Sequence, residues 1–152
     1  MIFNFFLCKL QSNFNQNRML SHKIQFRVRY GETDQMGYVY YGNYAQYFEM
    51  GRVEWLRNLG ISYKEMEANG IMLPVINMNI SYKKPAKYDE LLTLKTTLLK
   101  LPSAKIEFDF ELFNETGELL TQAYVSLVFI DIAKNRPVKA PELIIKKLSA
   151  YF

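Results

Sequence analysis

Apolar and polar residues alternate along several stretches of this chain, a period of two that is typical of half-buried strands. The first stretch is 24–30, where Ile, Phe, Val and Tyr alternate with Gln and Arg. The same period predicts strands over 76–83, 92–98 and 105–112. Residues 119–130 are apolar at nearly every position, as in a central strand that is buried on both faces.

One segment follows a helical period instead. Apolar and aromatic residues between Asn43 and Leu59 are spaced by three or four, which places them on one face of a helix about four turns long. Asn43 and Gln46 predict a capping box at its start. Gly51 lies on the apolar face, where glycine costs about 0.5–1 kcal/mol relative to alanine, so we expect a strand to approach closely there.

The order of these elements predicts an α+β fold: a five-stranded, curved antiparallel sheet wrapped around one long central helix. Short turns between successive strands favour antiparallel neighbours. Shorter helices are predicted over 62–69 and from Pro141, in the first turn, to about Ala150. A single domain is expected over 19–152. Residues 1–18 are predicted to be an extension outside the core, with Met19 as the natural start; the alternative is an N-terminal arm.

Composition narrows the possible chemistry. The chain of 152 residues has one cysteine and one histidine, which excludes a disulfide within the chain, a cysteine metal cluster and most histidine-based catalytic machinery. The net charge of +4 is uneven, because residues 31–133 alone carry nine basic and fourteen acidic side chains. No basic stripe interleaved with aromatic residues supports nucleic-acid binding. No apolar run approaches the roughly 18 residues of a membrane span, and a cytoplasmic location is expected.

Candidate chemistry gathers just before the long helix. Six of the eleven tyrosines fall between Tyr30 and Tyr47, together with Glu32 and Asp34. The N-terminus of a helix offers unpaired N–H groups that can polarise a carbonyl oxygen. A carboxylate upstream could attack that carbonyl or activate water. The alternative is that Asp34 only closes a turn and that the tyrosines belong to the core.

The same segment carries a family resemblance. Residues 30–44, YGETDQMGYVYYGNY, followed by 47–49 and 54–57, resemble the signature of hotdog-fold acyl-CoA thioesterases. The likeness is greatest to the 4-hydroxybenzoyl-CoA thioesterase family and its Tol–Pal-associated branch. Weaker similarity continues at 82–90 and 136–141.

The resemblance implies a hotdog fold over about 22–150 and assigns roles to individual residues. Asp34 matches the catalytic carboxylate, which acts as nucleophile or as general base. The backbone N–H of Tyr41 matches the donor that polarises the thioester carbonyl, although the Tol–Pal-associated branch commonly has histidine at this position. Glu49 matches an acidic residue that often lies near the active site across the dimer; the alternative is a solvated position or a pair with Arg52. Glu32 is predicted to be a surface residue.

Substrate-binding residues are also implied by the resemblance. Residues around 38–47 would build the acyl pocket, and the strand at 77–79 would line the pocket of the neighbouring subunit. Several cations would suit the phosphates of coenzyme A. The candidates are Gly37, Tyr38, Tyr40, Asn43, Tyr44, Asn77, Met78, Lys83, Lys84, Lys105 and Arg136.

The sequence therefore predicts an acyl-CoA thioesterase that releases free acid and coenzyme A, with no metal or redox cofactor. A homodimer or homotetramer is expected, with the site at the subunit interface, because the edges of so short a sheet need cover. The alternatives are a non-catalytic acyl-CoA-binding protein of the same fold and, with less support, a hotdog dehydratase or hydratase.

Overall fold

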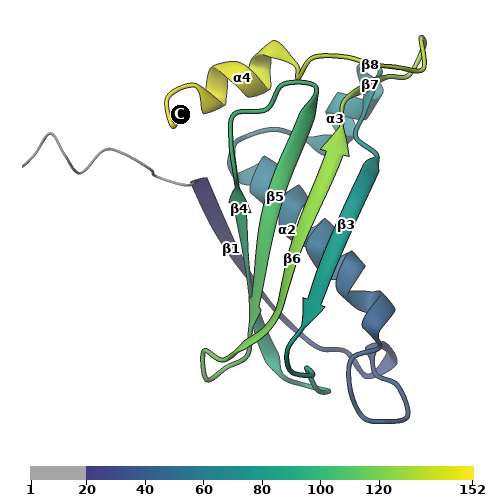
Figure 1. Ribbon diagram of the computed structural model, residues 1–152, viewed down its shortest axis with the longest axis vertical. Coiled ribbons are helices and arrows are strands. Elements are labelled where there is room, and N and C mark those ends of the chain that lie inside the picture. The colour runs from purple at the N-terminus through teal and green to yellow at the C-terminus, as the bar shows by residue number, and fades with distance from the viewer. Residues whose placement is uncertain (1–19) are drawn as a thin grey trace, which may run out of the picture.

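The computed structural model describes residues 20–152. The expectations for residues 1–18 and for Met19 lie outside the described residues. The main element is a five-stranded antiparallel sheet with one long helix packed on one face (Figure 1). This is the α+β arrangement predicted from the sequence. The strands follow the order β1-β4-β5-β6-β3 and span Leu20–Arg27 (β1), Val75–Tyr82 (β3), Leu91–Leu98 (β4), Lys105–Phe113 (β5) and Leu119–Val128 (β6).

The long helix α2, Tyr44–Asn58, confirms the helical period. Its apolar face meets the sheet: the Trp55 ring lies 5.1 Å from that of Phe108, centroid to centroid. The predicted close approach at Gly51 is also confirmed, because a Cβ added there would lie 2.6 Å from Thr96 Oγ1 and 2.7 Å from Leu94 Cδ2, both on β4. Glycine therefore allows the helix axis to come near the sheet.

The start of α2 differs from the prediction. A 3-10 turn, η2, covers Tyr41–Asn43, and Asn43 already has a helical backbone conformation. Its side chain caps no helix N–H; the amide instead donates a hydrogen bond of 2.8 Å to the carbonyl oxygen of Glu32. The capping box of Asn43 and Gln46 is therefore wrong, because the 3-10 turn extends the helix and frees the Asn43 side chain for the preceding loop.

The first strand begins earlier and ends earlier than the alternation predicts. It ends at Arg27, and Tyr30–Glu32 form a 3-10 turn, η1. The Arg29 N–H donates to a carboxylate oxygen of Glu32 at 2.8 Å, which turns the chain out of the sheet direction. At its other end, β1 extends to Leu20, which pairs with Leu98.

Smaller elements close one end of the sheet. A second, three-stranded sheet joins β2 (Ile71–Met72), β7 (Ile130–Asp131) and β8 (Arg136–Pro137). Helix α3 spans Tyr63–Ala68, with Ser62 as its N-cap, and α4 spans Glu142–Leu148. Pro141 precedes α4 as its N-cap residue, so its expected place in the first turn is wrong by one position. Within 20–152, no helix is long and apolar enough to cross a membrane.

Candidate active site

A narrow hairpin joins the two 3-10 turns and carries Asp34. The backbone N–H of Asp34 donates to the carbonyl of Tyr38 at 2.8 Å, and Thr33 and Val39 form a β-bridge. Gly37 has a φ of 77°, which glycine adopts without strain. The hairpin is tied to the loop after β3 by the Val39 N–H, which donates to the Ala86 carbonyl at 2.9 Å. The hairpin is therefore anchored at its base on both sides.

The Asp34 carboxylate is only partly engaged. Its side chain is half-buried, and Oδ1 accepts the backbone N–H of Met36 at 2.9 Å. This bond closes the turn at Asp34, which is the structural role that the sequence offered as an alternative to catalysis. Among residues 20–152, no group donates a hydrogen bond to the second oxygen, Oδ2. One oxygen therefore orients the carboxylate and the other is available for chemistry.

Tyr41 begins the 3-10 turn that leads into α2. As the first residue of the turn, it has a backbone N–H with no acceptor inside the turn. Its carbonyl oxygen accepts a hydrogen bond of 3.0 Å from the Tyr82 hydroxyl on β3. Its exposed ring packs on that of Tyr40, with centroids 4.6 Å apart. Next to it, Gly42 leaves room for the Tyr40 ring, which a Cβ would meet at 2.8 Å.

Glu32 is not a surface residue; that prediction is wrong. The residue is 7% exposed, and its carboxylate accepts four hydrogen bonds. Three come from Arg29, through its backbone N–H at 2.8 Å, Nε at 2.9 Å and Nη2 at 2.6 Å. The fourth comes from the buried Tyr47 hydroxyl on α2. The carboxylate thus joins the residue that precedes the turn η1 to the start of α2.

The environment of Glu32 favours its charged form. Burial by itself raises the pKa of this carboxyl, but the hydrogen bonds from Arg29 and Tyr47 outweigh burial and hold the pKa below its usual value. Burial, and then the neighbouring carboxylate, raise the pKa of Tyr47, so its hydroxyl remains a donor. The Glu32 carbonyl also accepts the Tyr40 N–H at 2.9 Å and the Asn43 amide. Glu32 therefore fixes both ends of the segment that bears Asp34 and Tyr41.

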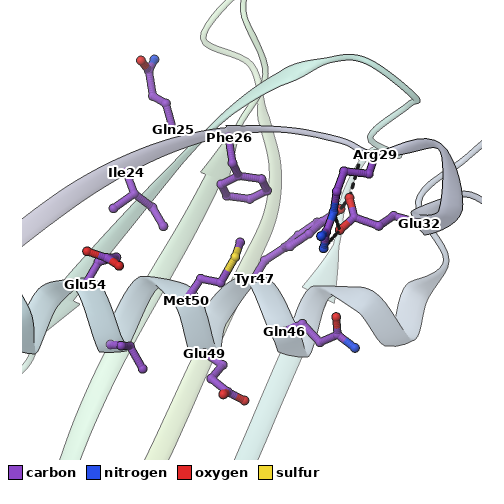
Figure 2. A pocket seen from close by; sticks show the side chains of 11 residues that line it. Ile24, Gln25, Phe26, Arg29, Glu32, Gln46, Tyr47, Glu49, Met50 and Glu54 are labelled. Carbon is purple, nitrogen blue, oxygen red and sulfur yellow. Dashed lines mark hydrogen bonds and ion pairs between the residues drawn. The ribbon is translucent and has the colours of Figure 1, made fainter. Parts of the chain in front are cut away.

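A wide hollow of the described residues lies elsewhere. It is a groove of about 900 Å³ between β1 and α2. Figure 2 shows the Arg29–Glu32 pair at one end and Glu49 pointing away from that pair, on the opposite side of α2. Asp34 and Tyr41 do not line this groove. The groove is therefore separate from Asp34 and Tyr41, although the third candidate, Glu49, is among its lining residues.

The candidate binding residues near the hairpin divide into two groups. Tyr38 and Tyr40 are exposed. Asn43 and Tyr44 are engaged within the chain: Asn43 bonds the Glu32 carbonyl, and the Tyr44 hydroxyl accepts the Ala86 N–H at 3.3 Å. Burial raises the pKa of Tyr44. The exposed pair is free to contact a ligand, while the engaged pair holds the loop.

The predicted phosphate-binding cations lie at two opposite ends of the sheet. Lys83 and Lys84 follow β3, near the hairpin, and both backbone N–H groups donate to the Leu120 carbonyl. The Lys84 ammonium pairs with Glu118. Lys105 begins β5 and Arg136 lies in β8, both at the far end (Figure 1). A single chain therefore does not bring the four cations together.

The strand residues Asn77 and Met78 lie on β3, which forms one edge of the five-stranded sheet. Asn77 is exposed and Met78 is half-buried against the core. Within residues 20–152, no group of three His, Cys, Asp or Glu side chains is placed to hold a metal ion.

Sequence reasoning missed the two best-buried charges of this region, Glu32 and Arg52. For Glu32 there was a local signal, because Arg29 stands three residues before it. For Arg52 the signal was the helical period, which places it on the same side of α2 as Phe48 and Trp55.

Comparison with known proteins gives a consistent picture. The model of the thioesterase-like superfamily matches residues 28–148. YneP of Bacillus subtilis is 38% identical over 117 residues, which cover 77% of this chain and 85% of that protein. The acyl-CoA thioesterase YbgC of Haemophilus influenzae is 33% identical over 127 residues, 82% of this chain and 93% of the relative. The crystal structure of a DHNA-CoA thioesterase from Staphylococcus aureus superimposes with a TM-score of 0.77 at 36% identity, covering 88% of this chain and 85% of the other.

Proposed function

Because this chain belongs to the thioesterase-like superfamily, we propose that it hydrolyses acyl-CoA thioesters, with Asp34 as the catalytic carboxylate. The fold is the hotdog fold of its thioesterase neighbours. One observation carries the assignment to Asp34. Its carboxylate lies on a hairpin held by backbone hydrogen bonds, and only one of its two oxygens accepts a hydrogen bond, from the Met36 N–H, among the described residues. The 3-10 turn that leads into α2 follows on the same hairpin.

The proposed reaction uses the backbone and one carboxylate. The N–H of Tyr41 donates to the thioester carbonyl oxygen and stabilises the negative charge that develops there. Asp34 then acts in one of two ways. As a base, it takes a proton from water, whose oxygen bonds to the carbonyl carbon while the C–S bond breaks. As a nucleophile, its own oxygen forms an anhydride and expels the thiolate, and water then cleaves the anhydride.

Thiolate is a good leaving group, so the reaction needs no strong general acid and we propose no metal or redox cofactor. The two routes differ in one intermediate. Rapid acid quench followed by mass spectrometry of the peptide that contains Asp34 distinguishes them. The nucleophilic route predicts an acyl mass increment on that peptide during turnover, and the general-base route predicts none.

We propose that the active unit contains at least two copies joined through β3. This strand is an edge of the sheet, and Val75 and Ile76 on it are 44% and 49% exposed. An exposed apolar edge strand is a template for pairing with another chain. Antiparallel pairing about a two-fold axis would set Asn77 and Met78 beside the neighbouring site. It would also carry Lys105 and Arg136 of one copy toward Lys83 and Lys84 of the other.

Exposed cations near the mouth of such a site support coenzyme A as the handle of the substrate, since lysine and arginine bind phosphate groups. The exposed rings of Tyr38 and Tyr40 are suited to line the entrance for an acyl or aryl group. A cytoplasmic location is proposed with this activity.

The function is tested by incubating the purified protein with a panel of acyl-CoAs and measuring thiol release. The panel includes short, medium and long acyl groups and DHNA-CoA, the substrate named for the Staphylococcus aureus relative. Saturable, catalytic release of thiol from at least one member is the expected result. Saturable binding without thiol release from any member would favour a binding protein of the same fold.

A further inference from the structure

Arg52 is a buried charge without a carboxylate partner among residues 20–152. It lies on α2 and is 8% exposed. Its Nη1 is buried and has no hydrogen-bond partner among the described residues. The contact recorded for its guanidinium is the Tyr63 ring, whose centroid lies 5.2 Å from Cζ. A ring face attracts a cation but accepts no full set of its hydrogen bonds, so this guanidinium still lacks an anion.

The guanidinium lines a hollow of about 290 Å³ between α2 and β3. Most of the lining is apolar, with Phe48 from the helix and Val75, Met78 and Val125 from the sheet. Arg52 and Glu49 are its charged residues. This hollow lies on the flank of α2 that faces the free edge strand, whereas the groove of Figure 2 lies on the flank facing β1. An anion that binds Arg52 through this hollow would therefore approach along the edge strand β3.

Glu49 supplies the complementary charge, since it lines this hollow together with Arg52, and it also lines the groove on the β1 flank. It precedes Arg52 by three residues, yet no ion pair joins the two within residues 20–152. Its carboxylate is exposed and points away from Arg29 and Glu32 (Figure 2). A surface that carries one acid and one base a helical turn apart is self-complementary under a two-fold axis, because each acid then meets the base of the other copy.

We propose that a second copy of this chain closes the hollow, and that Glu49 of the partner subunit binds Arg52 while Glu49 here binds the partner's Arg52. The pair is reciprocal and bidentate, a geometry that suits a guanidinium and a carboxylate. It rests on the proposed dimer through β3, and it is independent of the catalytic role of Asp34. It assigns Glu49 to the interface rather than to the reaction.

Charge reversal tests the pairing. Glu49→Arg and Arg52→Glu each place like charges opposite one another twice in the dimer. Each variant alone is expected to raise the dissociation constant of the dimer at least about tenfold, measured by analytical ultracentrifugation. In an equimolar mixture of the two variants both pairs become attractive again, so native mass spectrometry should show the heterodimer in excess over both homodimers.

Glu54→Arg is the matched control, because Glu54 lies on the same helix and, unlike Glu49, does not line the hollow beside Arg52. It should leave the dimer unchanged. If a reversed variant does not fold alone, co-expression of the two still tests the proposal, since the heterodimer relieves both reversals. Unchanged dimers of both variants, or a mixture without excess heterodimer, would overturn it.

Two further outcomes separate this inference from the proposed function. Arg52→Glu protein that stays dimeric but shows a raised KM only for acyl groups ending in a carboxylate would assign Arg52 to the substrate and overturn the pairing. If the mixed variants give the expected heterodimer excess but the wild-type protein releases no thiol, the proposed activity is removed and the pairing is still supported.

Discussion

The Tyr47 hydroxyl donates a hydrogen bond of 2.9 Å to the Glu32 carboxylate and so ties the long helix to the loop that bears Asp34. Both side chains are buried. The same carboxylate accepts hydrogen bonds from the guanidinium and the backbone N–H of Arg29, which precedes the turn η1. The position of the hairpin therefore depends on a buried acid that does not itself face the reaction.

Glu32→Gln is expected to destabilise the protein by about 1–3 kcal/mol, because an amide cannot accept from Arg29 and Tyr47 as a carboxylate does and leaves buried donors unpaired. Urea unfolding measures the change. Tyr47→Phe is the graded comparison and should cost about 1 kcal/mol, since it removes a single donor. A Glu32→Gln protein as stable as the wild type would show that the hydrogen bonds of Glu32 with Arg29 and Tyr47 contribute nothing to the free energy of unfolding.

The same acid predicts a pH dependence. The pKa of Glu32 is lowered in the folded state, so its contribution is present above the unfolded carboxyl pKa of about 4.3 and is lost as the pH falls through the lower folded pKa. The difference in unfolding free energy between wild type and Glu32→Gln should be constant near neutral pH and should shrink below about pH 4. A difference that widens in acid would contradict this sign.

Gly51→Ala should destabilise the fold although alanine favours helix. The new Cβ would lie 2.6 Å from Thr96 Oγ1 and 2.7 Å from Leu94 Cδ2. Overpacking of this kind costs about 1–3 kcal/mol, which exceeds the gain of up to about 1 kcal/mol in helix propensity. Thermal unfolding measures the effect. Gln46→Ala, at an exposed position of the same helix, should change stability by less than about 0.5 kcal/mol.

Tyr82→Phe removes the hydroxyl that donates to the Tyr41 carbonyl. The loss of one such bond, about 0.5–1.5 kcal/mol, should lower kcat about 2- to 10-fold if it loosens the turn that presents the Tyr41 N–H. KM should change less than kcat, since the bond orients a donor used in the transition state. An unchanged kcat would separate Tyr82 from the positioning of that turn.

The sequence predicted the parts of the fold that have a period. Alternation identified four of the five strands of the main sheet, and a continuous apolar run identified the fifth, β6. The spacing of three and four identified α2, including the close approach at Gly51. The two-residue strands β2, β7 and β8 are too short to show any period. The first residues of β1, 20–23, do not follow the alternation and form a strand because they pair with β4.

The chemistry of the loop was predictable only in part. Asp34 and Tyr41 could be singled out because they adjoin a helix start and match a family signature. The burial of Glu32 could not be predicted in the same way, since Tyr47 reaches it from fifteen residues further along the chain. The Asn43 amide likewise finds its acceptor eleven residues earlier, which a local capping rule does not anticipate.

The most direct test of the account is thiol release from the best acyl-CoA substrate by Asp34→Asn. The account predicts that kcat falls by about 10²–10⁴-fold, while the circular dichroism spectrum and the oligomeric state stay those of the wild type. Asp89→Asn, in the loop after β3, is the matched control and should keep full activity. An Asp34→Asn protein that turns over at the wild-type rate would contradict the central claim.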